Sequence, residues 1–115
     1  MSSPVGDRLG VGPVLHATPL ARTIVATMEE ENDGVLVHDE GAYLRVRAPR
    51  ICRLSRAAVE AAVGSMVQFP GELEVIMSSF AGRMRLNEDG AVWWLATDPP
   101  PEPPSAGPRL PPDGF

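Results

Sequence analysis

Few side chains in this sequence are of the types that hold metals. The two histidines are His16 and His38, Cys52 is the only cysteine, and no Glu-x-x-His pair occurs. A tetrahedral zinc site needs about four closely spaced ligands, and a di-iron site in a helix bundle needs several Glu and two His on facing helices. We therefore expect no metal site, and we interpret His38, which precedes an acidic turn, as a hairpin histidine.

Nucleophilic catalysis has little more support. Cys52 lies in an apolar strand pattern with no histidine close in sequence, which favours a small buried hydrophobe. Ser78 and Ser79 lack the G-x-S-x-G context of a nucleophile elbow. Gly10-Val11-Gly12 lacks the preceding strand and the third glycine of a dinucleotide fingerprint. The residues favour a protein with no catalytic site and no cofactor, and a hydrolase using Cys52 or a serine with a distant His remains an open alternative.

Length and charge exclude several other classes. A chain of 115 residues predicts one domain. Its formal net charge is −5, and its ten basic residues are all scattered arginines, so the basic face that nucleic acid requires is missing. The sequence has no apolar run of about 18 residues for a membrane span. With one cysteine and no signal-peptide pattern at its start, the chain is predicted to be cytoplasmic.

The first half of the chain predicts a strand, a helix and three strands. Gly10 to Leu15 reads as a strand, and Pro13 within it lacks an N–H, which suits an edge position. Thr18-Pro19-Leu20 predicts a helix start and Asn32-Asp33-Gly34 its end. The three strands are expected at 35–37, 42–46 and 51–54, the first two as a hairpin.

The second half predicts a helix and three strands. Ser55 is expected to cap the helix, and Phe69-Pro70-Gly71 to break it. Its predicted apolar face comprises Ala58, Val59, Ala62, Val63 and Met66. Alternation predicts a strand from Leu73 to Met77, and Asp89-Gly90 predicts a hairpin between 83–86 and 91–95. Neighbouring strand residues face opposite sides, so we expect one of Trp93 and Trp94 in the core and the other exposed for a contact.

These elements predict an α+β fold with a single compact domain. Two β-α-β-β-like halves would pack their helices on antiparallel or mixed sheets, with a flexible N-terminus at 1–9 and the folded domain at 10–97. Residues 98–115 hold eight of the 13 prolines and predict an extended or disordered tail.

Three segments, in this order along the chain, resemble the small effector (regulatory or coupling) proteins of soluble bacterial di-iron multicomponent monooxygenases. Val11-Gly12-Pro13-Val14 is similar to the entry segment of the toluene and alkene monooxygenase branch. Residues 37–43, VHDEGAY, resemble the first hairpin of the family, and 73–83, LEVIMSSFAGR, its most distinctive run. The resemblance extends from about Val11 to Leu95, and the Pro-rich tail departs from it.

The resemblance implies a cofactorless protein, without a catalytic site of its own, that binds the di-iron hydroxylase. There it would tune access of substrate and O₂ and couple NADH oxidation to hydrocarbon oxidation. It also implies competition with a Rieske ferredoxin or a reductase for one surface. The residues implied at the hydroxylase interface are Val11, Gly12, Pro13, Val14, Ser78, Ser79, Phe80, Ala81 and Gly82.

A second interpretation belongs to a different class. A small non-enzymatic adaptor domain could recruit a partner through the PPPEPP stretch of its tail, because Pro-rich segments bind aromatic-lined grooves. The residues implied at the interface have a structural alternative as well. Phe80 would then be an ordinary core residue, and Gly82 would only ease a hairpin.

Overall fold

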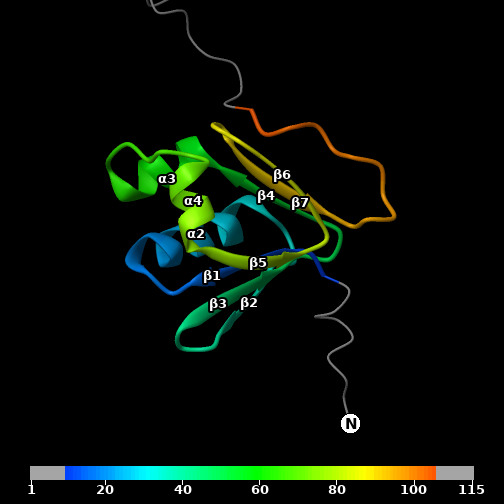
Figure 1. Cartoon of the computed structure of the whole chain (residues 1–115), viewed down its shortest axis with the longest axis horizontal. Coiled ribbons are helices and arrows are strands. Elements are labelled where there is room, and N and C mark those ends of the chain that lie inside the picture. The colour runs from blue at the N-terminus through cyan, green and yellow to red at the C-terminus, as the bar shows by residue number, and fades with distance from the viewer. Residues whose placement is uncertain (1–9, 106–115) are drawn as a thin grey trace, which may run out of the picture.

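The computed structural model describes residues 10–105, which form one α+β domain. Figure 1 shows two sheets with the helices gathered at one side of them. The elements in chain order are β1 (Gly12–His16), α2 (Pro19–Glu31), β2 (Leu36–Asp39), β3 (Tyr43–Arg47), β4 (Ile51–Ser55), α3 (Arg56–Val63), α4 (Gly71–Ile76), β5 (Met77–Ala81), β6 (Arg83–Asn87) and β7 (Gly90–Trp94).

The two predicted halves interlock by exchanging strands. One sheet has the order β2-β3-β1-β5 and the other β4-β7-β6, and all neighbours in both sheets are antiparallel. β5 of the second half therefore pairs with the first sheet, and β4 of the first half pairs with the second. The predicted α+β class is confirmed, and the exchange makes one domain of the two halves.

The first helix forms where the sequence predicts it. The Thr18 hydroxyl accepts a hydrogen bond from the Ala21 N–H at 3.0 Å, and Pro19 occupies the first helical position. Ile24 and Met28, one turn apart, are fully buried in the core. Leu15, Leu54 and Trp93 are buried in the same cluster, so the core joins α2 to strands of both sheets.

β1 is an interior strand, so the predicted edge position of Pro13 is wrong. The ladder between β1 and β3 pairs Val14 with Arg45 and resumes at a bridge between Val11 and Ala48. Pro13 lies in the gap between these pairs, opposite Val46, and because it has no N–H the Val46 carbonyl accepts from the Arg47 guanidinium at 2.8 Å instead. The Arg47 guanidinium donates to the Gly12 carbonyl at 3.1 Å in this gap.

The predicted strand from Leu73 to Met77 is also wrong, because this stretch forms α4 before β5 begins. Leu73 and Ile76 are buried, at a spacing of three, whereas Val75 between them is 79% exposed. The Glu72 carboxylate accepts from the Gln68 N–H at 2.6 Å, just before the helix. Acidic residues in a first turn favour a helix start, and that signal outweighed the short alternation.

The second helix is shorter than predicted. It ends at Val63 because Gly64 takes the left-handed conformation, with φ 83°. Of the predicted apolar face only Val59 is buried, and Met66 lies beyond the helix with 79% of its surface exposed. The Ser55 cap is confirmed, since its hydroxyl accepts from the Ala58 N–H at 3.2 Å.

Both tryptophans are buried, which corrects the expectation that one is exposed. Trp93 is 0% and Trp94 6% exposed. Trp93 belongs to the main core cluster, whereas Trp94 lies on the other face of its strand, outside that cluster. Residues 99–105 have no helix or strand and run along the outer side of the β4-β7-β6 sheet, where Figure 1 shows them in orange.

Candidate functional site

The two segments of the expected interface lie side by side as neighbouring strands. β1 and β5 pair in antiparallel register, with Gly12 opposite Ala81, Pro13 opposite Phe80 and Val14 opposite Ser79. The fold thus brings together residues more than 60 positions apart in the sequence. A β-α-β-β reading of separate halves could not predict this pairing, because it crosses from one half to the other.

The two strands contribute very different surfaces. Val11, Gly12 and Pro13 are buried and Val14 is half-buried, so this segment supports β5 and offers little surface to a partner. Ser78 and Ser79 are exposed, and Phe80 keeps 43% of its surface exposed. We call these three residues the β5 surface. A large aromatic side chain that stays this exposed is typical of a contact site.

A bulge shapes the β5 surface. The register of β1 and β5 shifts between Val14 and Leu15, because Val14 faces Ser79 and Leu15 faces Met77. Ser78 is the extra residue, and its hydroxyl donates to the Val14 carbonyl at 3.3 Å. Bulges increase local twist and redirect side chains, so the edge strand bends at the first residue of the β5 surface.

Gly82 turns the chain from one sheet into the other. It follows β5 and precedes β6, with φ +90°. A Cβ at this position would lie 2.6 Å from the Trp94 carbonyl oxygen and 2.7 Å from Val11 Cγ1. The glycine is needed both for the left-handed backbone and for close contact between the two sheets. Its role is to position the β5 surface.

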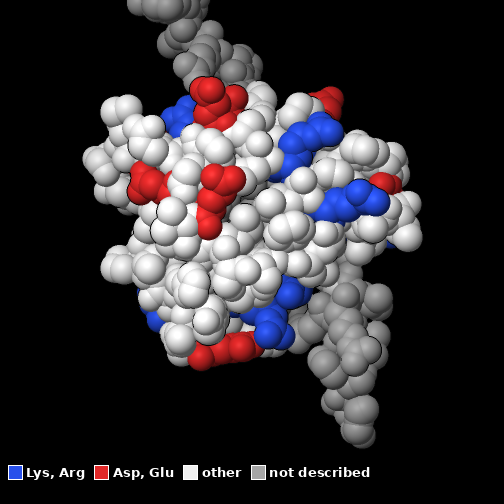
Figure 2. Space-filling view, viewed as in Figure 1, with Lys and Arg blue, Asp and Glu red and all other residues white. Residues whose placement is uncertain are grey.

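The surroundings of the β5 surface are asymmetric in charge. Figure 2 shows an uncharged band through the middle of this face, with acidic side chains over α4 on one side and basic side chains over β6 on the other. α4 contributes exposed Glu72 and Glu74, and β6 contributes exposed Arg83 and Arg85. Such a pattern orients a docking partner and sets specificity more than affinity.

Val75 is a candidate contact that the sequence analysis missed. It is 79% exposed on α4, the helix that contacts β5. The misread strand hid it, because alternation placed Val75 on the same side as buried Leu73. The spacing of Leu73 and Ile76 and the two acids of the first turn were the signals that could have revealed it.

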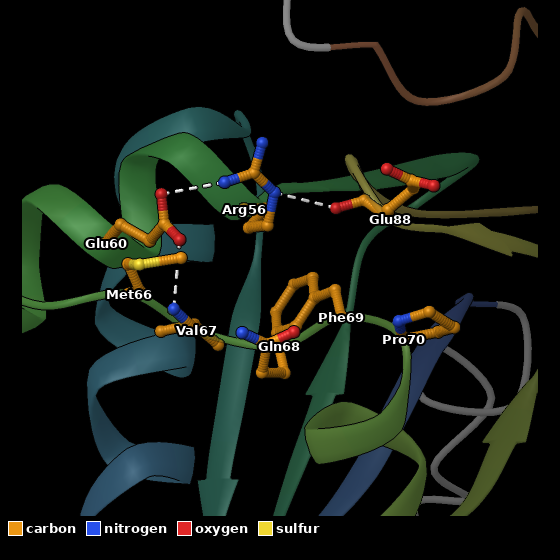
Figure 3. Close-up of a pocket in the computed structure, with 8 residues that line it drawn as sticks. All are labelled: Arg56, Glu60, Met66, Val67, Gln68, Phe69, Pro70 and Glu88. Carbon is orange, nitrogen blue, oxygen red and sulfur yellow. Dashed lines mark hydrogen bonds and ion pairs between the residues drawn. The ribbon is translucent and has the colours of Figure 1, made fainter.

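A pocket of about 340 Å³ lies between α3, the segment before α4 and the β6–β7 turn. Figure 3 shows Arg56 at its centre, with its guanidinium directed to Glu60 on one side and the Glu88 backbone on the other. Arg56 Nη1 lies 2.7 Å from Glu60 Oε1, and Arg56 Nε donates to the Glu88 carbonyl at 2.7 Å. The other Glu60 oxygen accepts from the Val67 N–H at 2.9 Å.

The charged groups of this pocket therefore bind one another and hold three segments together. We call Arg56, Glu60 and the Val67 N–H the α3 clasp. The Val67 N–H bond, followed by Arg56, lowers the pKa of the Glu60 carboxyl. A lowered pKa keeps this carboxylate charged to more acidic pH than an ordinary Glu, which makes Glu60 a poor general acid at neutral pH.

His16 and Cys52 have structural surroundings, and Cys52 is a free thiol buried in the core. The His16 ring packs on Tyr43, with 5.0 Å between ring centroids. Burial, with a smaller effect of Glu31, raises the pKa of the Cys52 thiol to about 12, so the thiol is protonated at neutral pH and is a weak nucleophile. Within residues 10–105, no group of three or more His, Cys, Asp or Glu side chains is placed to hold a metal ion.

No helix in the described part of the chain is long and apolar enough to cross a membrane.

Comparison with known proteins decides the family. Residues 10–94 match the model of the MmoB/DmpM family. The chain belongs to this family. The effector subunit of the alkene monooxygenase system of Xanthobacter autotrophicus (strain ATCC BAA-1158 / Py2) is 37% identical over 86 residues, which are 73% of this chain and 84% of that protein.

Solved structures agree on the fold of this MmoB/DmpM protein. Two structures of the complex between phenol hydroxylase and its regulatory protein match with TM-scores of 0.66 and 0.63. Each has a chain that is 19% identical to this one, and the matches cover 73% of this chain and 95% and 98% of those chains. The matched family region ends at Trp94, so the Pro-rich segment lies beyond it.

Proposed function

We propose that this MmoB/DmpM protein is the effector subunit of a multicomponent monooxygenase and binds the hydroxylase component of that system. The observation that carries this proposal is its 37% identity to an alkene monooxygenase effector subunit over nearly the whole domain. The relatives are named effector or regulatory proteins, which agrees with a regulatory role and not a catalytic one.

We infer that docking uses the β5 surface. Its small serines allow close backbone approach, Phe80 supplies an aromatic anchor, and an uncharged band with charged borders surrounds it. Gly12, Pro13 and Val14 pair with this strand within the sheet and support it along its inner edge. Ala81 and Gly82 end the strand, and Gly82 sets its direction.

The effect on the hydroxylase is a shift between two of its states. An effector changes an equilibrium only by binding one state more tightly than the other. The bound state would admit substrate and O₂ and deliver electrons productively, so that NADH oxidation becomes coupled to hydrocarbon oxidation. Competition with a Rieske ferredoxin or a reductase for the hydroxylase belongs to the same proposal, as does a cytoplasmic location.

Reconstitution with its hydroxylase, reductase and any ferredoxin tests the function. We expect added effector to raise the product formed per NADH consumed, and this effect to saturate as effector is titrated. An unchanged product yield and turnover across a titration to excess would show that the effector assignment is wrong. Varying the ferredoxin or reductase concentration at fixed effector then tests competition, which predicts inhibition by excess effector that more electron-transfer protein relieves.

A further inference from the structure

The outer face of the β4-β7-β6 sheet contains a buried apolar strip that the main core does not explain. Val92 is 0% and Trp94 6% exposed, and neither belongs to the main core cluster. In the ladders, Trp94 lies between Ile51 and Arg83. An apolar strip on the outside of a sheet remains buried only if something covers it.

Residues 98–105, which we call the strap, supply that cover. Pro99 and Pro101 line one hollow with Ile51 and Trp94, and Pro104 lines a second one near Leu54. Three contacts fix the strap along the sheet. Asp98 Oδ1 lies 2.7 Å from Arg50 Nη2, the Glu102 carbonyl accepts from Arg53 Nη1 at 3.5 Å, and the Pro104 carbonyl accepts from Asn87 Nδ2 at 3.0 Å.

The burial pattern of the strap has a period of three. Asp98, Pro101 and Pro104 are half-buried, whereas the residues between them are exposed. A polyproline II helix has three residues per turn and no internal hydrogen bonds, so every third residue faces the same side. The spacing of Asp98, Pro101 and Pro104 matches one side of such a helix laid on the sheet.

The sheet face has the features that recognise such a helix. Grooves that bind polyproline segments are lined by aromatic side chains, and Trp94 occupies the middle of this one. Arg50 and Arg53 border it, and Arg50 pairs with Asp98 at the start of the strap, whereas Arg53 donates to the Glu102 carbonyl. Trp94 Nε1 is buried and has no hydrogen-bond partner among residues 10–105.

We propose that the outer face of the β4-β7-β6 sheet is a docking surface for an acidic polyproline segment, and that the strap of the same chain is its resident occupant. Attachment in cis keeps the local strap concentration high, at about millimolar for a short flexible linker. The strap lies beyond the matched family region, which ends at Trp94, and the sheet face that it covers is separate from the β5 surface. The proposal therefore stands independently of the hydroxylase.

A matched pair of full-length variants tests the register of the strap. Pro101→Ala with Pro104→Ala removes the two prolines that face the sheet, and Pro100→Ala with Pro103→Ala removes two that face solvent. Both pairs loosen the polyproline helix equally, but only the first loses buried contacts. We expect hydrogen exchange of the Trp94 indole N–H to accelerate roughly tenfold or more in the first pair alone, with Trp93 as an internal reference.

Binding in trans completes the test. A synthetic peptide with the sequence of residues 98–105 should bind the Pro101→Ala, Pro104→Ala chain and shift the Trp94 indole signal. It should bind the wild-type chain at least roughly tenfold more weakly, because the resident strap competes. An Asp98→Asn peptide should bind less tightly and with weaker salt dependence.

Three results would overturn the proposal. Equal exchange of Trp94 in the two paired variants would show that the strap has no preferred side. Failure of the peptide to bind the opened chain would show that the face does not recognise polyproline. Equal binding to the opened and wild-type chains would show that the strap does not occupy the face.

Discussion

The β5 surface and the outer face of the β4-β7-β6 sheet differ in how far their aromatic side chains are exposed to solvent. Phe80 remains 43% exposed beside two serines, whereas Trp94 is 6% exposed beneath the strap. A single aromatic side chain among small polar residues adds little contiguous apolar surface, and monomeric proteins tolerate such exposure. Trp94 and the fully buried Val92 together form a larger contiguous apolar surface, and the strap covers it.

The difference separates two kinds of recognition. The β5 surface is open to solvent, with Ser78, Ser79 and Phe80 exposed. The covered face is available only to a segment that displaces the strap. Gly82 connects the two regions, because it follows Ala81 of β5 and a Cβ added to it would lie 2.6 Å from the Trp94 carbonyl oxygen.

The largest effect is expected where the two regions meet. Gly82→Ala places a Cβ about 2.6 Å from the Trp94 oxygen, at φ +90°. Left-handed strain and the clash together should lower the free energy of unfolding by about 3 kcal/mol or more. Gly41→Ala is the matched control, because its φ is +83° with nothing within 4 Å, and should cost only about 1–2 kcal/mol.

Urea denaturation of both variants measures this difference. Equal losses in the two variants would mean that the close approach at Gly82 contributes nothing. A bulky substitution such as Gly82→Trp cannot report on docking alone, because it would disturb both regions at once.

The sequence predicted local features well where chain neighbours determine them. The Thr18 and Ser55 caps, the hairpin at Asp89-Gly90 and the helix stripe with Ile24 all depend on residues within a few positions. β1 was placed at an edge because Pro13 lacks an N–H, but the Arg47 side chain bonds the carbonyls in that gap, so an interior strand tolerates the proline. The burial of both tryptophans was not predicted, because the strap that covers Trp94 belongs to a segment that its composition assigned to disorder.

The candidate site was predictable only in part. The resemblance named the segments at Val11 and Ser78, and the structure places them side by side. Which of them faces a partner depends on the strand order, which no local pattern encodes. The burial of Val11 and the exposure of Phe80 follow from that order.

The second prediction tests the open region. Phe80→Ala should weaken binding to the hydroxylase by roughly 1–2 kcal/mol, or about 5- to 30-fold, because an aromatic anchor is lost. Ser79→Trp should also weaken binding, by placing bulk where close approach is needed. Stability should change little in either variant, since both residues are exposed.

Leu36→Ala is the control for this region. Leu36 is 59% exposed on β2, at the opposite edge of the same sheet, so its loss should leave hydroxylase binding unchanged. Titration of labelled effector into hydroxylase measures all three variants. Wild-type affinity in folded Phe80→Ala and Ser79→Trp, or an equal loss in Leu36→Ala, would remove the β5 surface from the interface.

The third prediction tests the covered region. Asn87→Asp keeps the oxygen that accepts from the Asp89 N–H at 2.8 Å, but replaces the amide that donates to the Pro104 carbonyl at 3.0 Å. Loss of this anchor should loosen the end of the strap by about 1 kcal/mol. Proteolysis within 99–105 should therefore become faster, while stimulation of the hydroxylase stays as in wild type. A loss of stimulation instead would link the two regions functionally.

The smallest effect is expected at the α3 clasp, which connects α3 to the segment before α4 and, through Arg56, to the β6–β7 turn. Glu60 has a pKa lowered from its ordinary 4.5, first by the Val67 N–H and then by Arg56. A carboxyl with a lower pKa in the folded state stabilises the fold above its unfolded pKa, and this contribution is lost as pH falls through the folded value. The melting temperature of the wild-type protein should therefore decrease when the pH is lowered below about 4.5. In Glu60→Gln it should start slightly lower at pH 7 and fall less steeply on acidification. Parallel curves for the two proteins would show that Glu60 does not couple the clasp to pH.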